Sequence, residues 1–142
     1  MTQKNLQGAR KGDSVAAAKK QADHGDDHKS ARILIKAALR AKDYFKLTNK
    51  QFAEIIGISE ASMSRLQGKG RTALKPKEKE LILLFLRVFR SLDALMGGHE
   101  GNEHAWLTSH NRILNSVPLV LMKKIDGLNR VVDYLDAARG HG

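Results

Sequence analysis

The 142-residue chain contains no cysteine, so disulfides and thiolate chemistry are excluded, and we expect a reducing, cytoplasmic location. The N-terminus lacks the apolar core of a signal peptide. The longest uninterrupted apolar run, Leu81 to Leu86, is far too short to span a bilayer, so we expect no membrane partner.

Recognisable catalytic motifs are also lacking. No Ser-His-Asp or HExxH arrangement is apparent, and the glycine-rich segment 97–101 lacks the strand and helix that flank a phosphate loop. His99 and His104 fit a solvated loop better than a ligand pair. The segment 24–28, HGDDH, lacks the further ligands that a metal site needs. We therefore expect no enzyme activity, no cofactor and no metal.

Positive charge is concentrated in one half of the chain. The net charge is +10, and residues 1–80 hold 18 Lys and Arg against 9 Asp and Glu, whereas residues 81–142 hold 7 against 6. This asymmetry favours a polyanionic partner for the first half only. The alternative is a basic surface that serves solubility.

Helical periodicity runs through the chain, and no segment is a convincing strand, so we expect an all-α fold. Ser30 is suited to cap a helix over about 31–45, and Pro118 suits the first turn of a later one. Asp126 is suited to cap the last helix. The expected organisation is a disordered polar tail (1–29), a helix-turn-helix domain (30–75), a linking and dimerisation helix (76–98) and a C-terminal domain (99–142).

The linking helix is expected from Lys77 to Met96, where Gly97-Gly98 ends it. Between Leu81 and Met96 only Arg87, Arg90, Ser91 and Asp93 are polar, so its apolar face is unusually wide. Such a helix must be covered on nearly all sides. We expect a homodimer to supply part of that cover; the alternative is that the two halves of one monomer suffice.

The stretch QFAEIIGISEASMSRL, residues 51–66, has the spacing of a helix-turn-helix. Thr48 and Ser59 are placed to cap its two helices, and Gly57 supplies positive φ at the turn. The outer face of the second helix carries no bulky apolar residue, so this helix can enter the major groove of DNA. A helical pair used only for packing is the alternative.

Arg65 is suited to pair with guanine or with a phosphate, whereas Glu60 must accept from cytosine or bend away from phosphate. The candidate DNA-binding residues are Lys50, Gln51, Ser59, Glu60, Ala61, Ser62, Ser64, Arg65, Lys69 and Arg71.

The segment LTNKQFAEIIGISEASMSRLQGKG resembles the helix-turn-helix of Xre-type regulators. Together with ARILIKAALRAKDYFKL and WLTSHNRILNSVPLVLMKKIDGLNRVVDYLD, it resembles a narrower group over residues 31–139. That group is the antitoxins with an MbcA/ParS/Xre C-terminal domain, which are partners of RES-domain toxins. Two departures are His110, where the group often has proline, and the segment 115–116, where it tends to have glycine. Asn115 tolerates the left-handed conformation that such a site requires.

The resemblance implies an antitoxin in which residues 99–142 bind a RES-domain toxin that degrades NAD, covering the entrance to its active site. It also implies that the helix-turn-helix binds operator DNA and regulates the antitoxin's own operon. The residues that we expect to bind the toxin are Asn111, Arg112, Tyr134, Ala138 and Arg139.

Alternative interpretations remain at this stage. Arg139 would block contacts meant for a phosphate of NAD, or it simply favours a helix C-terminus. Trp106 fits the core better than an interface. The whole chain could instead be a stand-alone regulator whose C-terminal part dimerises or senses a ligand, or a toxin inhibitor whose helix-turn-helix has lost DNA affinity.

Overall fold

The computed structural model describes residues 27–141 except 69, 72 and 100, and these residues form an all-helical fold with one isolated backbone bridge. The all-α prediction is therefore confirmed. Of the predicted disordered tail (1–29), residues 1–26, with His24 and Asp26 of the HGDDH segment, lie outside the described residues, whereas residues 27–29 belong to the first helix. Within the described part, no group of three acidic or histidine side chains is placed to hold a metal, and no helix could cross a membrane.

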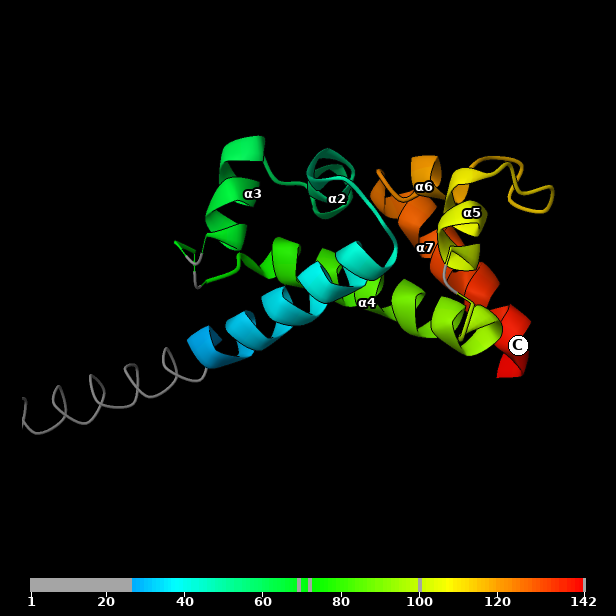
Figure 1. The fold of residues 1–142 in the computed structure, drawn as a ribbon, viewed down its shortest axis with the longest axis horizontal. Coiled ribbons are helices and arrows are strands. Elements are labelled where there is room, and N and C mark those ends of the chain that lie inside the picture. Colours follow the sequence, from blue (N-terminus) through cyan, green and yellow to red (C-terminus); the bar gives the residue numbers. More distant parts are fainter. Residues whose placement is uncertain (1–26, 69, 72, 100, 142) are drawn as a thin grey trace, which may run out of the picture.

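The fold is organised along one long central helix, α4 (Figure 1). The first helix covers residues 27–44 and is followed by the helix-turn-helix at one end of α4; the remaining helices lie at the other end. The elements after the first helix are α2 (Asn49–Ile56), α3 (Glu60–Gln67), α4 (Pro76–Met96), α5 (Asn102–Thr108), α6 (Pro118–Leu121), α7 (Ile125–Asp136) and the π-helical turn η1 (Ala137–His141).

Two predicted helix starts are wrong. Ser30 lies inside the first helix, which includes residue 27, because no glycine or proline interrupts the chain after Gly25. Asp126 lies in the first turn of α7, whose N-cap is the extended Lys124. A carboxylate in a first helical turn is still favourable, because it faces the positive end of the helix dipole.

Helix α4 has the predicted length and stops at Gly97, but it is not apolar all round. Its first turn is the charged segment 76–80, and Arg87, Arg90 and Asp93 are exposed farther along. Its buried side chains include Leu81, Ile82, Phe85, Val88 and Leu92. The helix is therefore amphipathic, with a wide buried face that both ends of the fold share.

Phe85 is the centre of that shared face. Its ring packs edge-to-face against Phe45 at a centroid distance of 5.9 Å and against Phe52 at 5.3 Å, and all three rings are fully buried. Such geometry places the positive ring edge on the negative ring face. The same hydrophobic core continues to Leu128 and Leu135 of α7, so one core joins the two ends.

A close approach of the chain also fixes α7 against α6. Gly127 is buried, and a Cβ atom at this position would overlap the backbone carbonyl of Leu121. Only glycine fits here, because any side chain would push the two segments apart.

Glu103 on α5 is an exception to the apolar core. Its residue is 3% exposed, and Oε1 has no hydrogen-bond partner among the described residues. Burial raises the pKa of the Glu103 carboxyl, and the nearby Asp93 carboxylate raises it further. Hydrogen bonding by Tyr44 lowers this pKa, but the net shift is upward. The buried carboxylate therefore opposes folding at neutral pH.

We predict that Glu103→Gln raises the free energy of unfolding at neutral pH, by on the order of 1 kcal/mol. The folded-state pKa lies above the ordinary value of 4.5, so the wild type loses stability as the pH rises through the folded pKa. The variant does not titrate there, and its advantage shrinks on acidification. Thermal unfolding over a range of pH measures this difference. A gain in stability that does not depend on pH would show that the charge of the buried carboxylate is not the cause.

Candidate functional site

The helix-turn-helix is held by local hydrogen bonds that the sequence predicts. Thr48 Oγ1 accepts from the backbone N–H of Gln51 at 3.1 Å, and Gln51 Oε1 accepts from the Thr48 N–H at 2.9 Å. Ser59 Oγ accepts from the Ser62 N–H at 3.1 Å. Gly57 has φ +71°, as predicted for the turn. These local bonds fix where α2 and α3 begin and where the turn lies between them.

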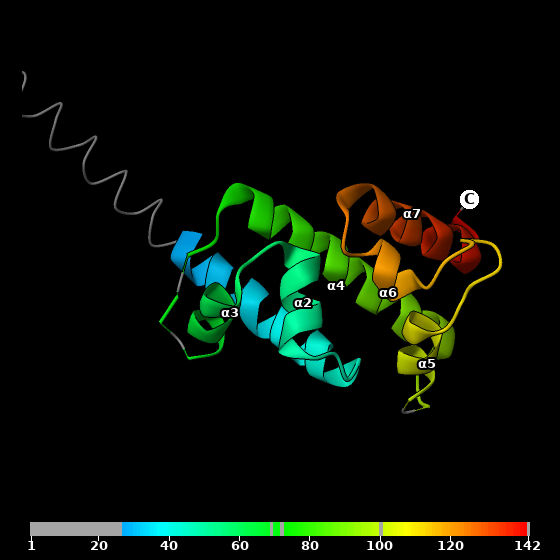
Figure 2. The same ribbon diagram turned by 90° about the horizontal axis from the view of Figure 1, so that it is seen from above.

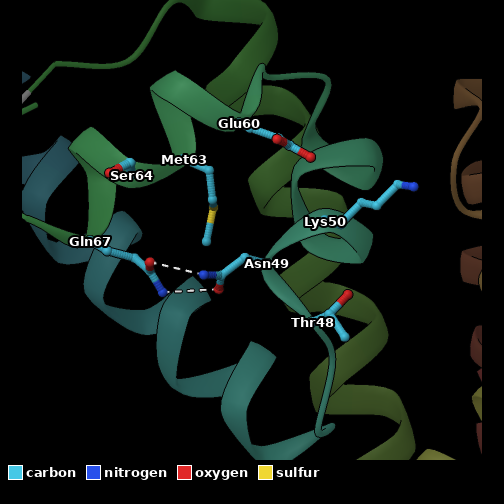
Figure 3. Close-up of a pocket in the computed structure, with 7 residues that line it drawn as sticks. All are labelled: Thr48, Asn49, Lys50, Glu60, Met63, Ser64 and Gln67. Atoms are coloured by element: carbon cyan, nitrogen blue, oxygen red, sulfur yellow. Dashed lines mark hydrogen bonds between the residues drawn. The ribbon is translucent and has the colours of Figure 1, made fainter.

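A pair of amides closes the two helices against each other. Asn49 on α2 and Gln67 on α3 exchange two hydrogen bonds of 3.0 Å across a groove of about 430 Å³ (Figure 3). Lys50 extends outward from the same groove. Sequence reasoning missed this pair, because two amides 18 residues apart have no recognisable spacing.

The candidate DNA-binding residues divide into two groups. Gln51 and Ser59 use their side chains as caps, and half-buried Ser62 accepts a hydrogen bond of 3.1 Å from the guanidinium of Arg65. Lys69 lies outside the described residues. The candidates that are exposed on α2 and α3, apart from the cap Ser59, are Lys50, Glu60, Ala61, Ser64 and Arg65.

Arg71 is placed differently from the DNA-binding residue that we expected. Its guanidinium forms an ion pair with Glu78 of α4, and the two side chains are only 16% and 11% exposed. Burial raises the pKa of Glu78, but the hydrogen bonds from Arg71 and from the Lys75 N–H outweigh it, and the net shift is downward. The pair therefore ties the segment after α3 to the start of α4, and we leave Arg71 out of the proposed interface.

In the C-terminal part, Asn111 organises a braced loop over residues 111–116. Its Oδ1 atom accepts from the N–H groups of Ile113 and Leu114, both at 3.0 Å, and its backbone pairs with that of Ser116. Arg130 of α7 donates to the Leu114 carbonyl at 3.0 Å. Asn111 thus holds the loop together through its side chain and its backbone.

The tip of this loop exposes an apolar side chain that sequence reasoning did not single out. Ile113 is 75% exposed and follows the exposed Arg112. Asn115 takes φ +54°, the left-handed conformation that its position required. A rigid loop that presents one apolar and one cationic side chain is suited to anchor a protein partner.

The other C-terminal candidates lie on α7 and η1. Tyr134 is half-buried and stacks on Trp106, with ring centroids 6.1 Å apart. Arg139 is exposed, and its Nη1 donates to Ser91 Oγ of α4 at 3.3 Å. Ala138 is also exposed. The braced loop and η1 both lie at the end of the molecule away from α3 (Figure 1).

Two polar contacts join the halves outside the core. Lys123, before α7, forms an ion pair of 2.8 Å with Glu54 of α2, and its hydrogen bond lowers the pKa of Glu54. His104 Nδ1 lies 2.8 Å from the carbonyl oxygen of Phe45. The helix-turn-helix and the C-terminal helices, which carry the two candidate surfaces, therefore contact each other directly.

Comparison with protein families gives a match for each half. Residues 26–87 match the antitoxin Xre-like helix-turn-helix domain. Residues 91–140 match the antitoxin Xre/MbcA/ParS C-terminal toxin-binding domain. A search of the curated proteins found none that matches the chain.

We predict that Asn111→Ala lowers the free energy of unfolding by about 1 kcal/mol, because two N–H groups of the loop lose their acceptor. Asn111→Asp keeps an oxygen at the same position and should stay close to the wild type. Urea unfolding of the two variants measures this. Equal losses from both substitutions would show that the side-chain amide nitrogen, and not Oδ1, holds the loop.

Proposed function

We propose that this chain, which belongs to the Xre-type antitoxins, neutralises a RES-domain toxin with its C-terminal domain and represses its own operon with its helix-turn-helix. The observation that carries the proposal is the succession of an antitoxin DNA-binding domain and an antitoxin toxin-binding domain in one chain. Neither family is an enzyme family, and we assign the chain no catalytic role.

For operator binding, the exposed face of α3 is the part that enters the major groove. Arg65 extends from this face, where it reaches a guanine edge or a phosphate, and Lys50 anchors a phosphate from the start of α2. Glu60, in the first turn of α3, accepts from a cytosine amino group. Ser64 lies on the same groove as Glu60 and contributes a hydroxyl.

For toxin binding, we assign the braced loop 111–116 and the C-terminal end of α7. Arg112 and Ile113 contact the toxin from the loop, while Tyr134, Ala138 and Arg139 contact it from α7 and η1. The guanidinium of Arg139 replaces contacts that the toxin makes with a phosphate of NAD. Binding in this way covers the entrance to the nucleotide site, and NAD is no longer degraded.

We further propose a homodimer that uses the surface between the first helix and α4. A groove of about 400 Å³ lies there, lined by Ala37, Arg40, Ala41, Tyr44, Leu86, Phe89 and Arg90. Leu83, one helical turn before Leu86, is exposed beside it. A second copy would cover this apolar surface and place two recognition helices on half-sites about 34–36 Å apart.

The competing function is a stand-alone regulator that has no toxin partner. Co-expression with the product of the adjacent reading frame, followed by pull-down and mass determination, separates the two. Growth arrest by that product, rescue by this chain and a stable complex support the antitoxin. No toxicity and no complex would leave only the regulator.

We predict that Arg65→Ala weakens operator binding by about 1–3 kcal/mol and leaves toxin neutralisation unchanged. The side chain is exposed and its only described hydrogen bond is to Ser62, so the fold should be retained. A mobility-shift titration and a growth-rescue assay on the same variant measure both activities. Loss of both activities together would contradict separate surfaces.

The converse variant is Ile113→Asp. We predict that it weakens toxin binding at least tenfold, because it places a charge where an apolar contact is proposed. Operator binding should be unchanged. Arg139→Ala tests the second contact region. Point substitution is preferable to truncation, because removing the C-terminus would also remove the ion pair between Asp136 and Arg87. Unchanged toxin affinity in both variants would show that the toxin binds a different surface.

A further inference from the structure

The first helix carries a row of exposed cations. Lys29, Arg32, Lys36 and Arg40 follow one another at spacings of three or four residues, which places them along one face. None of the four forms an ion pair with any described residue. The row ends near Asp43, whose carboxylate is engaged by Lys42 at 3.1 Å. An acidic counterpart for the row is therefore missing from the part of the chain that the structure describes.

The row is adjacent to α3. A groove of about 570 Å³ separates the two helices, and it is lined by Arg32, Ile35, Lys36, Leu39, Leu66, Gln67 and Arg71. In the view of Figure 2 the N-terminal part of this helix overlaps α3, and the residues that line the groove come from both segments. Since Arg71 is engaged by Glu78, Arg32 and Lys36 supply the unneutralised charge of the groove.

Gln67 connects this basic groove to the helix-turn-helix. Its side chain lines both the groove against the first helix and the groove between α2 and α3. Lys50, Glu60 and Ser64 line the second of these grooves. A chain of phosphates that passes the end of α3 would therefore meet both sets of residues.

We propose that Lys29, Arg32 and Lys36 form a second contact with the phosphate backbone of duplex DNA, separate from the helix-turn-helix contacts. The inference rests on the proposed DNA binding. From residue 29 to residue 36 these three cations extend about 10 Å along the helix axis. One strand of B-DNA carries about three phosphates over that length, so the number and spacing of the cations match those of the phosphates.

This contact does not read sequence. The cations lie on a different helix from the recognition helix, and phosphate contacts position a protein without distinguishing bases. Its removal therefore lowers the affinity for operator DNA and for unrelated DNA by the same factor. That uniform loss separates it from a contact of Arg65 with a guanine edge, whose removal would change the preference for the operator.

The test is Arg32→Gln/Lys36→Gln in the full chain, with binding measured over a range of salt concentrations. The probes are a duplex of arbitrary sequence and a duplex from the region upstream of the gene. We expect affinity for both probes to fall about tenfold or more at 0.1 M salt. The slope of log affinity against log salt should flatten by about two, one unit for each lost phosphate contact.

Lys123→Gln/Lys124→Gln is the matched control, because it removes two exposed cations that lie outside both proposed binding surfaces and changes the net charge equally. It should leave both slopes unchanged. The charge-conserving Arg32→Lys/Lys36→Arg should bind DNA like the wild type, and helical circular dichroism checks the fold of every variant.

Four outcomes overturn the inference. If the wild type binds the upstream duplex and Arg32→Gln/Lys36→Gln has the same slope, the row does not contact phosphates, although the proposed function stands. If the control flattens the slope equally, only overall charge matters. If the wild type binds neither duplex, the proposed DNA binding itself fails. A loss of toxin affinity in the double variant, without a change in DNA binding, would assign the row to an acidic protein surface instead.

Discussion

The burial of α4 on two sides is the interaction on which the rest of the structure depends. Phe85 meets Phe45 and Phe52 on the helix-turn-helix side, while Val88 and Leu92 continue the buried face toward the core residues of α7. The buried side chains of the helix-turn-helix and of the C-terminal helices belong to one hydrophobic core. Displacing α4 would therefore disturb both surfaces together, which makes it a shared structural element.

The two proposed binding surfaces are consequently parts of one structure with a single hydrophobic core. The ion pair between Glu54 and Lys123 and the contact between His104 and Phe45 add polar links across the same junction. Exposed ion pairs of this kind contribute little free energy, so the shared apolar core provides most of the connection.

Where a feature depends on neighbours in sequence, it could be predicted. Thr48, Ser59 and Gly57 act as expected, because capping and positive φ are properties of a few consecutive residues. The errors at Ser30 and Asp126 arose at helix ends, where several starts differ by small free energies. The exposure of Ile113 could not be predicted, because it follows from how Asn111 and Arg130 hold the loop.

The sequence by itself determined the helical class, the helix-turn-helix and the family, because periodicity, caps and glycine positions are local and repeat along the chain. It also determined the excess of positive charge in the first half. Only the tertiary structure decided how that charge is used. It pairs Arg71 with Glu78 and brings Arg32 and Lys36 beside α3, and such pairings depend on distances between segments that are far apart in sequence.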